Sequence, residues 1–373
     1  MRWVDPLAEN PDESAQHHVE ADRAHDDPDG NASERGAALL VFSGQLQIAH
    51  APEFSISLVS NLEKQPPEVV VSETATGATI LEPRDVPLGG PRAMNVRRTL
   101  PQRSRSLIGA WCFVDHYGPD LVAEKGGMVV PPHPHTGLQT VSWLFAGEVE
   151  HRDSVGSHAM VRPGELNLMT AGSGIAHSEV STAATTVLHG AQLWLALPDA
   201  SRHQAPFFEH YVPTPVRFGD ATVRVFLGSL LGERSTATAF SPLVGAQLDL
   251  PAGASIDLPV DAGFEHGVLL DAGALDLNGA AVAKDELAFV PTGSATLRLT
   301  AGDSPVRALL IGGAPFGESI IMWWNFIGRT HDEIVQYRAD WQAQTDRFGG
   351  VTGYDGDWLN APVMPGIQLK PRG

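Results

Sequence analysis

Short stretches of alternating apolar and polar residues recur along most of the chain, and glycine or proline separates them. Residues 94–100 alternate like a half-buried strand, residues 139–145 are rich in β-prone side chains, and residues 186–197 form an apolar strand that ends before Pro198. Because side chains two apart in a strand share a face, this pattern predicts antiparallel strands with a buried side. Their regular spacing predicts an all-β barrel or sandwich.

Two parts of the chain repeat each other. Residues 165–173 read Glu-Leu, three mostly apolar residues, a small turn and then Gly-Ser, and residues 286–294 follow the same plan. Upstream, residues 145–149 resemble residues 271–275, with a loop five residues shorter (18 minus 13) in the second copy. An internal repeat of this length predicts two related antiparallel barrels in tandem.

The repeat and the changes in composition divide the chain into parts. We expect an extension over residues 1–66, a first barrel over residues 67–212, a second barrel with a helix over residues 213–348, and a tail over residues 349–373. Within the first barrel, strands are expected at residues 69–71 and 78–81. The first barrel should therefore begin with strands close to its N-terminal boundary.

The second copy lacks the histidines of the first. An offset of 121 residues puts Arg298 opposite His177 and Thr300 opposite Glu179, and no His-x-His occurs in the second half. We therefore expect the second barrel to hold no metal. Its expected task is to cover the first barrel and to shape one wall of its pocket.

A short helix is expected after the second barrel. Thr330 and Glu333 have the spacing of a capping box, which predicts the start of the helix. Its apolar face is expected to consist of Ile334, Val335, Tyr337 and Trp341. We expect Gly349-Gly350 to end the helix, and the tail beyond it to lie on a barrel surface or to fray.

Composition and charge narrow the class of protein. With 38 Gly, 28 Pro and 18% charged residues, the chain suits many short strands joined by turns. The net charge of -19 leaves no basic stripe to neutralise phosphates, which argues against direct nucleic-acid binding. The first 36 residues hold ten acids and three Arg, so ten minus three gives seven of these nineteen negative charges. We expect this extension to be disordered, because it cannot bury enough apolar surface.

The cysteine content and the lack of a long apolar run bear on the compartment. The chain has a single cysteine, Cys112, which excludes an intramolecular disulfide and suits a reducing cytosol. Its expected role is that of a small buried hydrophobe. No stretch approaches the roughly 18 to 20 apolar residues that span a bilayer. We therefore expect a cytoplasmic protein with no membrane contact.

Two histidine-containing stretches carry the candidate chemistry. His133 and His135 lie two residues apart between prolines, and His177 and Glu179 have the same spacing in a glycine-rich stretch. If both stretches are extended and face each other inside a barrel, three imidazoles and one carboxylate meet at one point. This ligand set suits a divalent first-row metal and leaves room for substrate or dioxygen.

Three other histidines are weaker candidates. His151 and His158 compete with His177 for the place of the third imidazole, but neither has a glycine-rich approach. His116 follows Asp115 shortly before the site in sequence. Its two interpretations are a place in the pocket lining and a structural hydrogen bond, and the second is the simpler.

These stretches resemble the cupin motif and, more specifically, the pirin family. Five residues separate Gly127 from His133-x-His135, and Gly172-x-Gly174-x-x-His177 matches the second half of the cupin motif, with Gly where Pro is usual. HPHTGLQTVSW, EHRDS and TAGSGIAHSE are similar to pirin sequence in particular. The resemblance runs from about residue 83 to about residue 348.

The chain departs from the cupin pattern at Gln139, where the motif and most pirins have Glu. A neutral amide is a poor metal ligand, so Gln139 is expected to lie behind the ligands, to line the pocket or to serve in packing. The resemblance to pirins implies that Glu179 supplies the acidic ligand instead.

The resemblance implies a bicupin fold and two activities. Pirin-like proteins include members with quercetin 2,3-dioxygenase activity, which implies a small aromatic enol or catechol substrate with Glu179 as ligand and proton acceptor. Fe(II) suits the ligand set best, with Mn, Ni, Cu and Zn as competitors. The family also includes iron-dependent regulators that act through a protein partner. A cupin isomerase is a third interpretation, but the chain lacks a basic cluster for a phosphorylated substrate.

Overall fold

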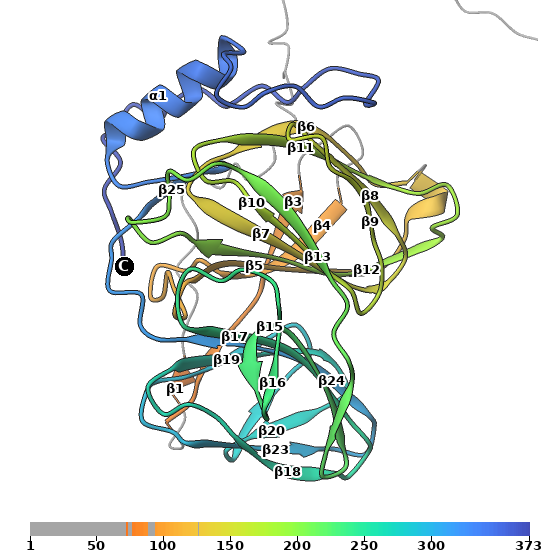
Figure 1. Cartoon of the computed structure of the whole chain (residues 1–373). Coiled ribbons are helices and arrows are strands. Elements are labelled where there is room, and N and C mark those ends of the chain that lie inside the picture. Colours follow the sequence, from red (N-terminus) through yellow and green to blue (C-terminus); the bar gives the residue numbers. More distant parts are fainter. Residues whose placement is uncertain (1–71, 74–76, 89–93, 126) are drawn as a thin grey trace, which may run out of the picture. The chain divides into compact units, whose positions relative to one another are not determined.

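The computed structural model describes residues 72–73, 77–88, 94–125 and 127–373 (Figure 1). The extension expected over residues 1–66 and the strand expected at residues 69–71 lie outside the described residues. The described part consists mainly of β-strands, with a single α-helix among these residues, so the prediction of an all-β chain is confirmed.

The first barrel pairs a large antiparallel sheet with a small one (Figure 1). In spatial order, the large sheet consists of β13 (Phe207–Tyr211), β10 (Leu166–Thr170), β7 (Leu138–Ala146), β12 (Val187–Ala196), β5 (Trp111–Leu121), β4 (Met94–Leu100) and β3 (Arg84–Leu88). The small sheet consists of β6 (Val129–His135), β11 (Ile175–Ser181), β8 (Val149–Asp153) and β9 (His158–Val161). A 3-10 turn over Val122–Lys125 follows β5.

The second barrel has the same plan. Its large sheet consists of β1 (Ser72–Glu73), β2 (Thr79–Leu81), β22 (Leu287–Val290), β19 (Glu265–Ala272), β24 (Val306–Gly313), β17 (Leu243–Leu250), β15 (Ala221–Leu230) and β14 (Val216–Phe218), with β16 (Glu233–Arg234) beside β15. Its small sheet consists of β18 (Ser255–Pro259), β23 (Thr296–Ala301), β20 (Leu275–Leu277) and β21 (Ala280–Val282).

The two barrels correspond strand by strand. The order β10-β7-β12-β5 of the first large sheet matches β22-β19-β24-β17 of the second, and the small sheets match as β6-β11-β8-β9 and β18-β23-β20-β21. The predicted repeat, 165–173 with 286–294, therefore marks β10 and β22, which occupy equivalent places in their sheets. Two tandem antiparallel barrels are confirmed.

Strand β2 lies in a different barrel from the one we expected. We predicted that residues 78–81 belong to the first barrel, but β2 pairs with β22 of the second. Ala78 and Ile80 pack into the core of the second barrel. The reason is positional: β2 fills the place beside β22 that β13 fills beside β10, so the segment before the first barrel completes the sheet of the second.

The two large sheets also pack against each other through a shared core. On β5, β7 and β12 alternate side chains face the second barrel, as expected for strands with a period of two. This buried cluster includes Val114, Val141, Trp143 and Leu193 of the first barrel and Phe226, Leu269 and Leu309 of the second. The indole N–H of Trp143 donates to Gln247 Oε1 at 2.9 Å. The opposite faces of β5, β7 and β12 therefore point into the first barrel.

The interior of the second barrel is an aliphatic core, with Leu258, Val268, Leu297 and Leu299 among its buried members. Arg298, which the offset of 121 residues placed opposite His177, is exposed and pairs with Asp257 at 2.7 Å. Alternation explains this, because Leu297 and Leu299 on either side of Arg298 point inward. The constant offset of 121 residues thus does not place Arg298 on the inward face that His177 occupies in the first barrel.

The helix α1 (His331–Gln342) begins as predicted, with Thr330 as N-cap and a complete capping box to Glu333. Its buried residues Ile334, Tyr337 and Trp341 pack in a cluster with residues of the first barrel. The helix therefore covers the first barrel rather than the second. Short strands β25 (Ile321–Trp323) and β26 (Phe326–Gly328) connect it to the second barrel.

Two details of the helix prediction are wrong. Val335 is 40% exposed, because one residue turns about 100° around a helix and leaves the stripe of Ile334 and Trp341. The helix also ends at Gln342, well before Gly349-Gly350. Gln344 adopts a φ of 50° and its side chain donates to the carbonyl of Trp341, which closes the last turn.

The tail lies on the first barrel. The backbone N–H of Leu359 donates to the carbonyl of Pro132 on β6 at 2.8 Å. The indole N–H of Trp341 donates to the carbonyl of Leu359 at 2.7 Å. The tail therefore closes the outer side of β6, the strand that carries His133 and His135.

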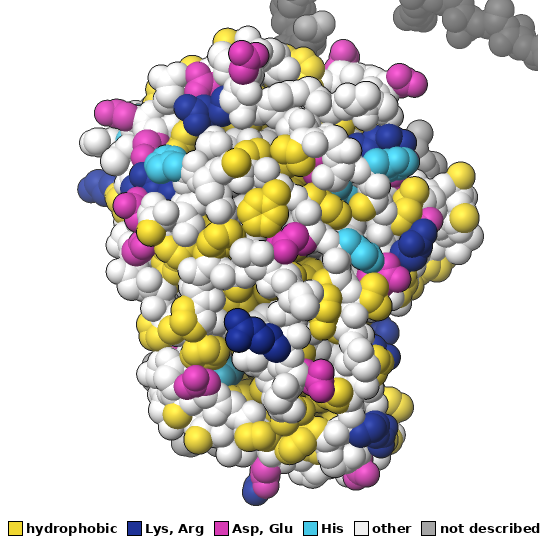
Figure 2. All heavy atoms as spheres, viewed as in Figure 1, with side chains coloured by type: hydrophobic (Ala, Val, Ile, Leu, Met, Phe, Trp, Pro, Cys, Tyr) yellow, Lys and Arg dark blue, Asp and Glu magenta, His cyan; other side chains and the backbone are white. Residues whose placement is uncertain are grey.

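The remaining sequence expectations concern the surface and Cys112. On the face shown in Figure 2, basic, acidic and hydrophobic side chains are interspersed rather than gathered in a stripe of one charge. Cys112 is fully buried and free, as expected for a small hydrophobe. In the part of the chain that the structure describes, no helix is long and apolar enough to cross a membrane.

Candidate metal centre

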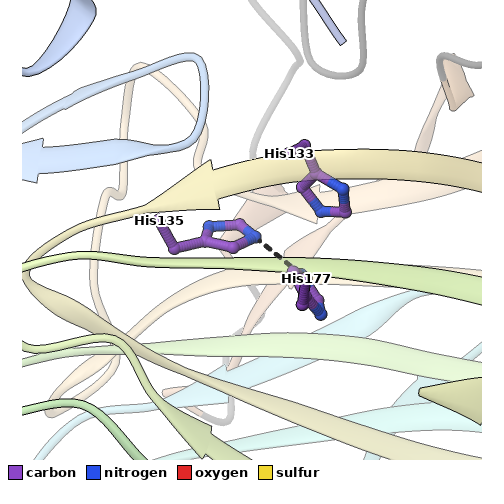
Figure 3. A group of neighbouring side chains, drawn as sticks. All are labelled: His133, His135 and His177. Carbon is purple, nitrogen blue, oxygen red and sulfur yellow. Dashed lines mark hydrogen bonds between the residues drawn. The ribbon is translucent and has the colours of Figure 1, made fainter. Parts of the chain in front are cut away.

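Three histidines converge inside the first barrel. His133 and His135 lie on β6, and His177 lies directly opposite His133 on the neighbouring strand β11. One ring nitrogen from each residue falls within 4.8 Å of the other two, and all three side chains are buried. Figure 3 shows the rings turned toward a common space between the two strands. We call these residues the histidine triad.

The Nδ1 atom of every triad ring has a hydrogen-bond partner. His133 Nδ1 lies 2.9 Å from the carbonyl oxygen of Pro131, and His135 Nδ1 lies 3.2 Å from that of Asn325. His177 Nδ1 lies 3.4 Å from Nδ1 of His151. A carbonyl oxygen only accepts, so Nδ1 of His133 and His135 carries the proton. The lone pairs on their Nε2 atoms are therefore free to bind a metal ion.

Burial keeps the triad neutral. Loss of solvation lowers the pKa of His133 to about 4, and it lowers the pKa of His135 and His177 well below the usual value of 6.5. Neighbouring triad imidazoles lower the pKa of His135 and His177 further. At neutral pH the rings are uncharged, which is the form that binds metal ions.

The donor set fits a divalent ion. His135 Nε2 and His177 Nε2 lie 3.1 Å apart in a buried site, where two facing lone pairs repel unless a proton or a cation lies between them. Two bonds of about 2.0 to 2.1 Å to one ion, at about 90° to 109°, separate their nitrogens by about 2.8 to 3.4 Å. The observed separation falls within that range.

Glu179 lies in the same cavity but outside the triad. Its carboxylate is not among the atoms that fall within 4.8 Å of one another. The pairing of β11 with β6 shifts between His177 and Glu179, where β6 holds one extra residue. Strand β11 keeps a regular register with β8, so Glu179 stays on the same face as His177. Ser142 Oγ donates to Glu179 Oε1 at 3.5 Å. Burial raises the pKa of Glu179, so this carboxylate binds a proton more readily than a solvated one.

The triad and Glu179 line a cavity whose walls are mostly apolar. It encloses about 710 Å³ of empty space, the solvent at its mouth included. Phe113 and Trp194 stack at 4.0 Å between ring centroids, and Trp194 meets His135 edge to face at 5.1 Å. The other lining residues include Val96, Tyr117, Met128, Val130, Leu144, Val149, Val161, Gln192 and Asn325.

A buried ion pair also faces this cavity. Arg98 donates to both carboxylate oxygens of Asp115 at 2.6 and 2.7 Å, and its guanidinium lies 4.3 Å over the ring of Phe113. Neither these residues nor Asn325 lie in a recognisable motif, so the sequence did not indicate them as part of the site. Their only signal was position: Asp115 and Phe113 alternate along β5 on the face that points into the barrel.

Gln139 and His116 are not among the residues that line the cavity, so the pocket interpretation does not hold for either residue. Gln139 Nε2 donates to Thr170 Oγ1 at 2.9 Å and to the carbonyl of Thr238 at 3.0 Å. Alternation along β7 explains the error, because Ser142 and Leu144 point into the cavity while Gln139 shares the other face with Val141. The same rule on β5 turns His116 away from Asp115.

His116 belongs to a second buried group between the barrels, the interbarrel cluster of His116, His189 and Asp271. His116 Nε2 lies 2.8 Å from Asp271 Oδ1, and His116 Nδ1 lies 2.6 Å from Asp285 Oδ1. His189 Nε2 lies 2.5 Å from the same oxygen of Asp271, and Arg307 donates to Asp271 Oδ2 at 2.5 Å. The structural hydrogen bond expected for His116 is present, but its partners come from the second barrel.

The two competing histidines occupy different places. His151 is buried, contacts His177 and lies 3.1 Å from Asp153 through its Nε2 atom. His158 is exposed and pairs with Glu150 at 2.7 Å. The structure therefore brings His177, and neither competitor, into the group of three converging nitrogens.

Two tandem antiparallel barrels, the first holding the histidine triad, define a bicupin. The chain belongs to the pirin family: residues 93–195 match the family description Pirin, and residues 245–349 match the Pirin C-terminal cupin domain. The resemblance read from the sequence is confirmed.

Relatives in sequence and in structure agree with this assignment. A Pseudomonas aeruginosa protein named "Putative quercetin 2,3-dioxygenase" is 43% identical over 284 residues, which cover 76% of this chain and 89% of that protein. The crystal structure of a quercetin 2,3-dioxygenase from Acinetobacter baumannii matches with a TM-score of 0.74 at 37% identity, covering 78% of this chain and 97% of that one. An Escherichia coli pirin solved in complex with nickel(II) matches with a TM-score of 0.51, covering 64% of this chain and 99% of that one. Its identity of 19% shows a shared fold alone.

Proposed function

We propose that this protein is a metal-dependent dioxygenase of the quercetin 2,3-dioxygenase type, acting on a small aromatic enol or catechol. The observation that carries the proposal is the convergence of three neutral imidazoles in the wall of an apolar cavity. The names of the Pseudomonas and Acinetobacter relatives support it.

The triad and Glu179 are the residues that would hold the ion, and Fe(II) is the metal we propose, with Mn, Ni, Cu or Zn as alternatives. A divalent ion bound here supplies a Lewis acid that acidifies a coordinated hydroxyl and a centre for reaction with O2. The carboxylate of Glu179 suits the proton acceptor, because burial raises its pKa.

The cavity walls fit an aromatic substrate. Phe113 and Trp194 present a stacked pair of rings next to His135. Aliphatic side chains such as Val96 and Leu144 exclude water from the space beside them. An aromatic ring carrying adjacent oxygens can thus pack against Trp194 while its oxygens point toward the triad.

As part of the same proposal, we place the protein in the cytoplasm. The support is Cys112, the only cysteine of the chain, which is buried and free. A free thiol suits a reducing compartment.

Oxygen uptake by the Fe(II)-loaded protein with quercetin tests the proposed activity. We expect uptake by the unmodified protein, none by His177→Ala, and unchanged uptake by His158→Gln, whose exposed side chain pairs with Glu150 away from the triad. Protein that demonstrably holds Fe(II) but consumes no oxygen with quercetin or simple catechols would contradict the dioxygenase. That outcome would favour the alternative of a metal-dependent regulator acting through a protein partner.

A further inference from the structure

His177 differs from the other triad residues in how its proton is placed. His133 and His135 donate from Nδ1 to backbone carbonyls, which can only accept, so a single contact fixes the tautomer of each. The partner of His177 Nδ1 is another imidazole nitrogen, Nδ1 of His151, which can either donate or accept. If His151 donated, the His177 proton would sit on Nε2, and no lone pair would face the triad.

Asp153 decides the direction of that hydrogen bond. His151 Nε2 lies 3.1 Å from Asp153 Oδ2, and an ionised carboxylate only accepts. The proton of His151 therefore sits on Nε2, and its Nδ1 becomes the acceptor for His177. Burial by itself raises the pKa of Asp153, but hydrogen bonds from His151 and Ser157 lower it overall, so the carboxylate is ionised at neutral pH.

The carboxylate of Asp153 is itself held in place by the turn after β8. Its Oδ1 atom accepts the backbone N–H groups of Val155 at 3.0 Å and Ser157 at 2.9 Å. Its other oxygen is left to face His151. The ring of His151 also stacks on Phe208 with 4.7 Å between centroids, which limits its rotation.

Strand register brings these groups together. In the pairing of β11 with β8, His177 lies opposite Asp153 and Glu179 lies opposite His151, so all four side chains share one face of the small sheet. His151, Asp153 and His177 are buried. The chain of contacts runs from the turn to Asp153, to His151 and to His177 within one hairpin and its neighbouring strand.

We propose that Asp153 and His151 are positioning residues that fix the Nδ1 proton of His177 and thereby direct its Nε2 lone pair at the metal. The inference rests on the metal site of the proposed function but not on the reaction. Such outer partners orient a ligand and raise its basicity, and their loss typically weakens metal binding about 10- to 100-fold.

Asp153→Asn is the sharpest test, because it keeps the shape and reverses the hydrogen bond. The amide oxygen can still accept the backbone N–H groups, while the amide nitrogen donates to His151 Nε2. His151 then carries its proton on Nδ1, and two N–H donors face each other at His177. We expect the affinity for Co(II), measured by competition with a chelator, to fall about 10- to 100-fold.

His151→Phe tests the same step independently, since it keeps a ring against Phe208 and removes the acceptor. We expect a similar loss of Co(II) affinity. In the NMR spectrum of the Co(II) protein, the exchangeable Nδ1 proton of His177 should lose its slow exchange, while those of His133 and His135 persist. A change in packing alone would not select one of these protons.

The matched controls are His158→Gln and Glu150→Gln on the same hairpin, whose side chains pair with each other at 2.7 Å away from His177. Both should bind Co(II) as the unmodified protein does. Unmodified protein that binds Co(II), with unchanged affinity in Asp153→Asn and His151→Phe, would overturn this inference and leave the proposed function intact. An equal loss in His158→Gln would also overturn it. Failure of the unmodified protein to bind Co(II) would overturn both.

Discussion

The histidine triad and the interbarrel cluster are both buried, yet their surroundings are opposite. In the triad, the Nδ1 atoms face neutral acceptors and the Nε2 atoms of His135 and His177 face each other at 3.1 Å. In the interbarrel cluster, carboxylates occupy both nitrogens of His116, and Arg307 takes the second oxygen of Asp271. The first group has unused lone pairs and no charge, whereas the second already has its counter-charges.

This difference decides what each group can do. A cation stabilises the triad, because it relieves the repulsion of neutral donors in a buried site. The interbarrel cluster gains little from a cation, since Arg307 already pairs with Asp271 and the two histidines lie within hydrogen-bond distance of its other oxygen. Its expected role is to hold β5 and β12 of the first barrel against β19 of the second. In both groups, one potential ligand atom from each residue lies within 4.8 Å of the others. Proximity alone therefore does not identify a metal site.

The two groups also differ in the pKa of the buried carboxylate beside or within them, Glu179 or Asp271. Of these two residues, Glu179 should have the larger effect on activity when it is replaced by Gln. Burial raises the pKa of Glu179, whereas hydrogen bonds from His116 and His189 outweigh burial and lower that of Asp271. We expect Glu179→Gln to reduce kcat about 10²- to 10⁴-fold, as for loss of a general base, with little change in the affinity for quercetin. Steady-state kinetics and substrate titration would measure both, with Glu150→Gln as control. Equal losses of turnover and binding would argue against the role of proton acceptor.

Removing Asp271 should have the largest effect on stability. Asp271→Ala leaves Arg307, His116 and His189 in a buried site without their shared carboxylate, and breaking such a network costs about 3 to 5 kcal/mol. Urea unfolding would measure the loss. Asp257→Ala removes an exposed partner of Arg298 and should leave the unfolding midpoint unchanged. Similar midpoints for both variants would mean that the interbarrel cluster does not hold the barrels together.

In the metal-free protein, the contributions of the two groups to stability should depend differently on pH. The folded pKa of His133 is about 4, below the reference value of 6.5, so the unfolded chain binds the extra proton first. This part of the stability is fully present above pH 6.5 and falls by up to about 1.4 kcal/mol per pH unit down to pH 4. Asp271, whose pKa is lowered from 3.8, keeps its contribution above that pH.

Urea unfolding of the chelator-treated protein and of His133→Gln at pH 7, 6 and 5 would measure this effect. The unmodified protein should lose more stability than the variant at each step. Parallel losses in the two proteins would contradict the low pKa of His133.

The smallest effect is expected at His266 in the second barrel. His266 is buried, and among the described residues neither ring nitrogen has a hydrogen-bond partner. Because an unsatisfied buried polar group costs about 1 to 3 kcal/mol, His266→Leu should raise the free energy of unfolding by about 1 kcal/mol. His189→Leu, which removes a partner of Asp271, should lower it instead. A loss of stability in His266→Leu would show that this histidine has a partner after all.

Sequence patterns were enough to predict the fold and the converging histidines. The repeated pattern at β10 and β22 identified two barrels, and the spacing of His133 and His135 put both side chains on one face. These features depend on local periodicity, because side chains two residues apart in a strand lie on the same face. The capping box at Thr330 was predictable for the same reason.

Tertiary structure decided everything that depends on which strand lies beside which. His116 pairs with Asp271 and Asp285, which lie 155 and 169 residues away in sequence. The carbonyl that fixes the tautomer of His135 lies 190 residues away. Register likewise put β2 in the second barrel and placed Glu179 opposite His151, outside the three converging nitrogens. Local spacing determines the face on which a side chain lies, but its partner across a sheet or between barrels depends on packing that no short stretch of sequence specifies.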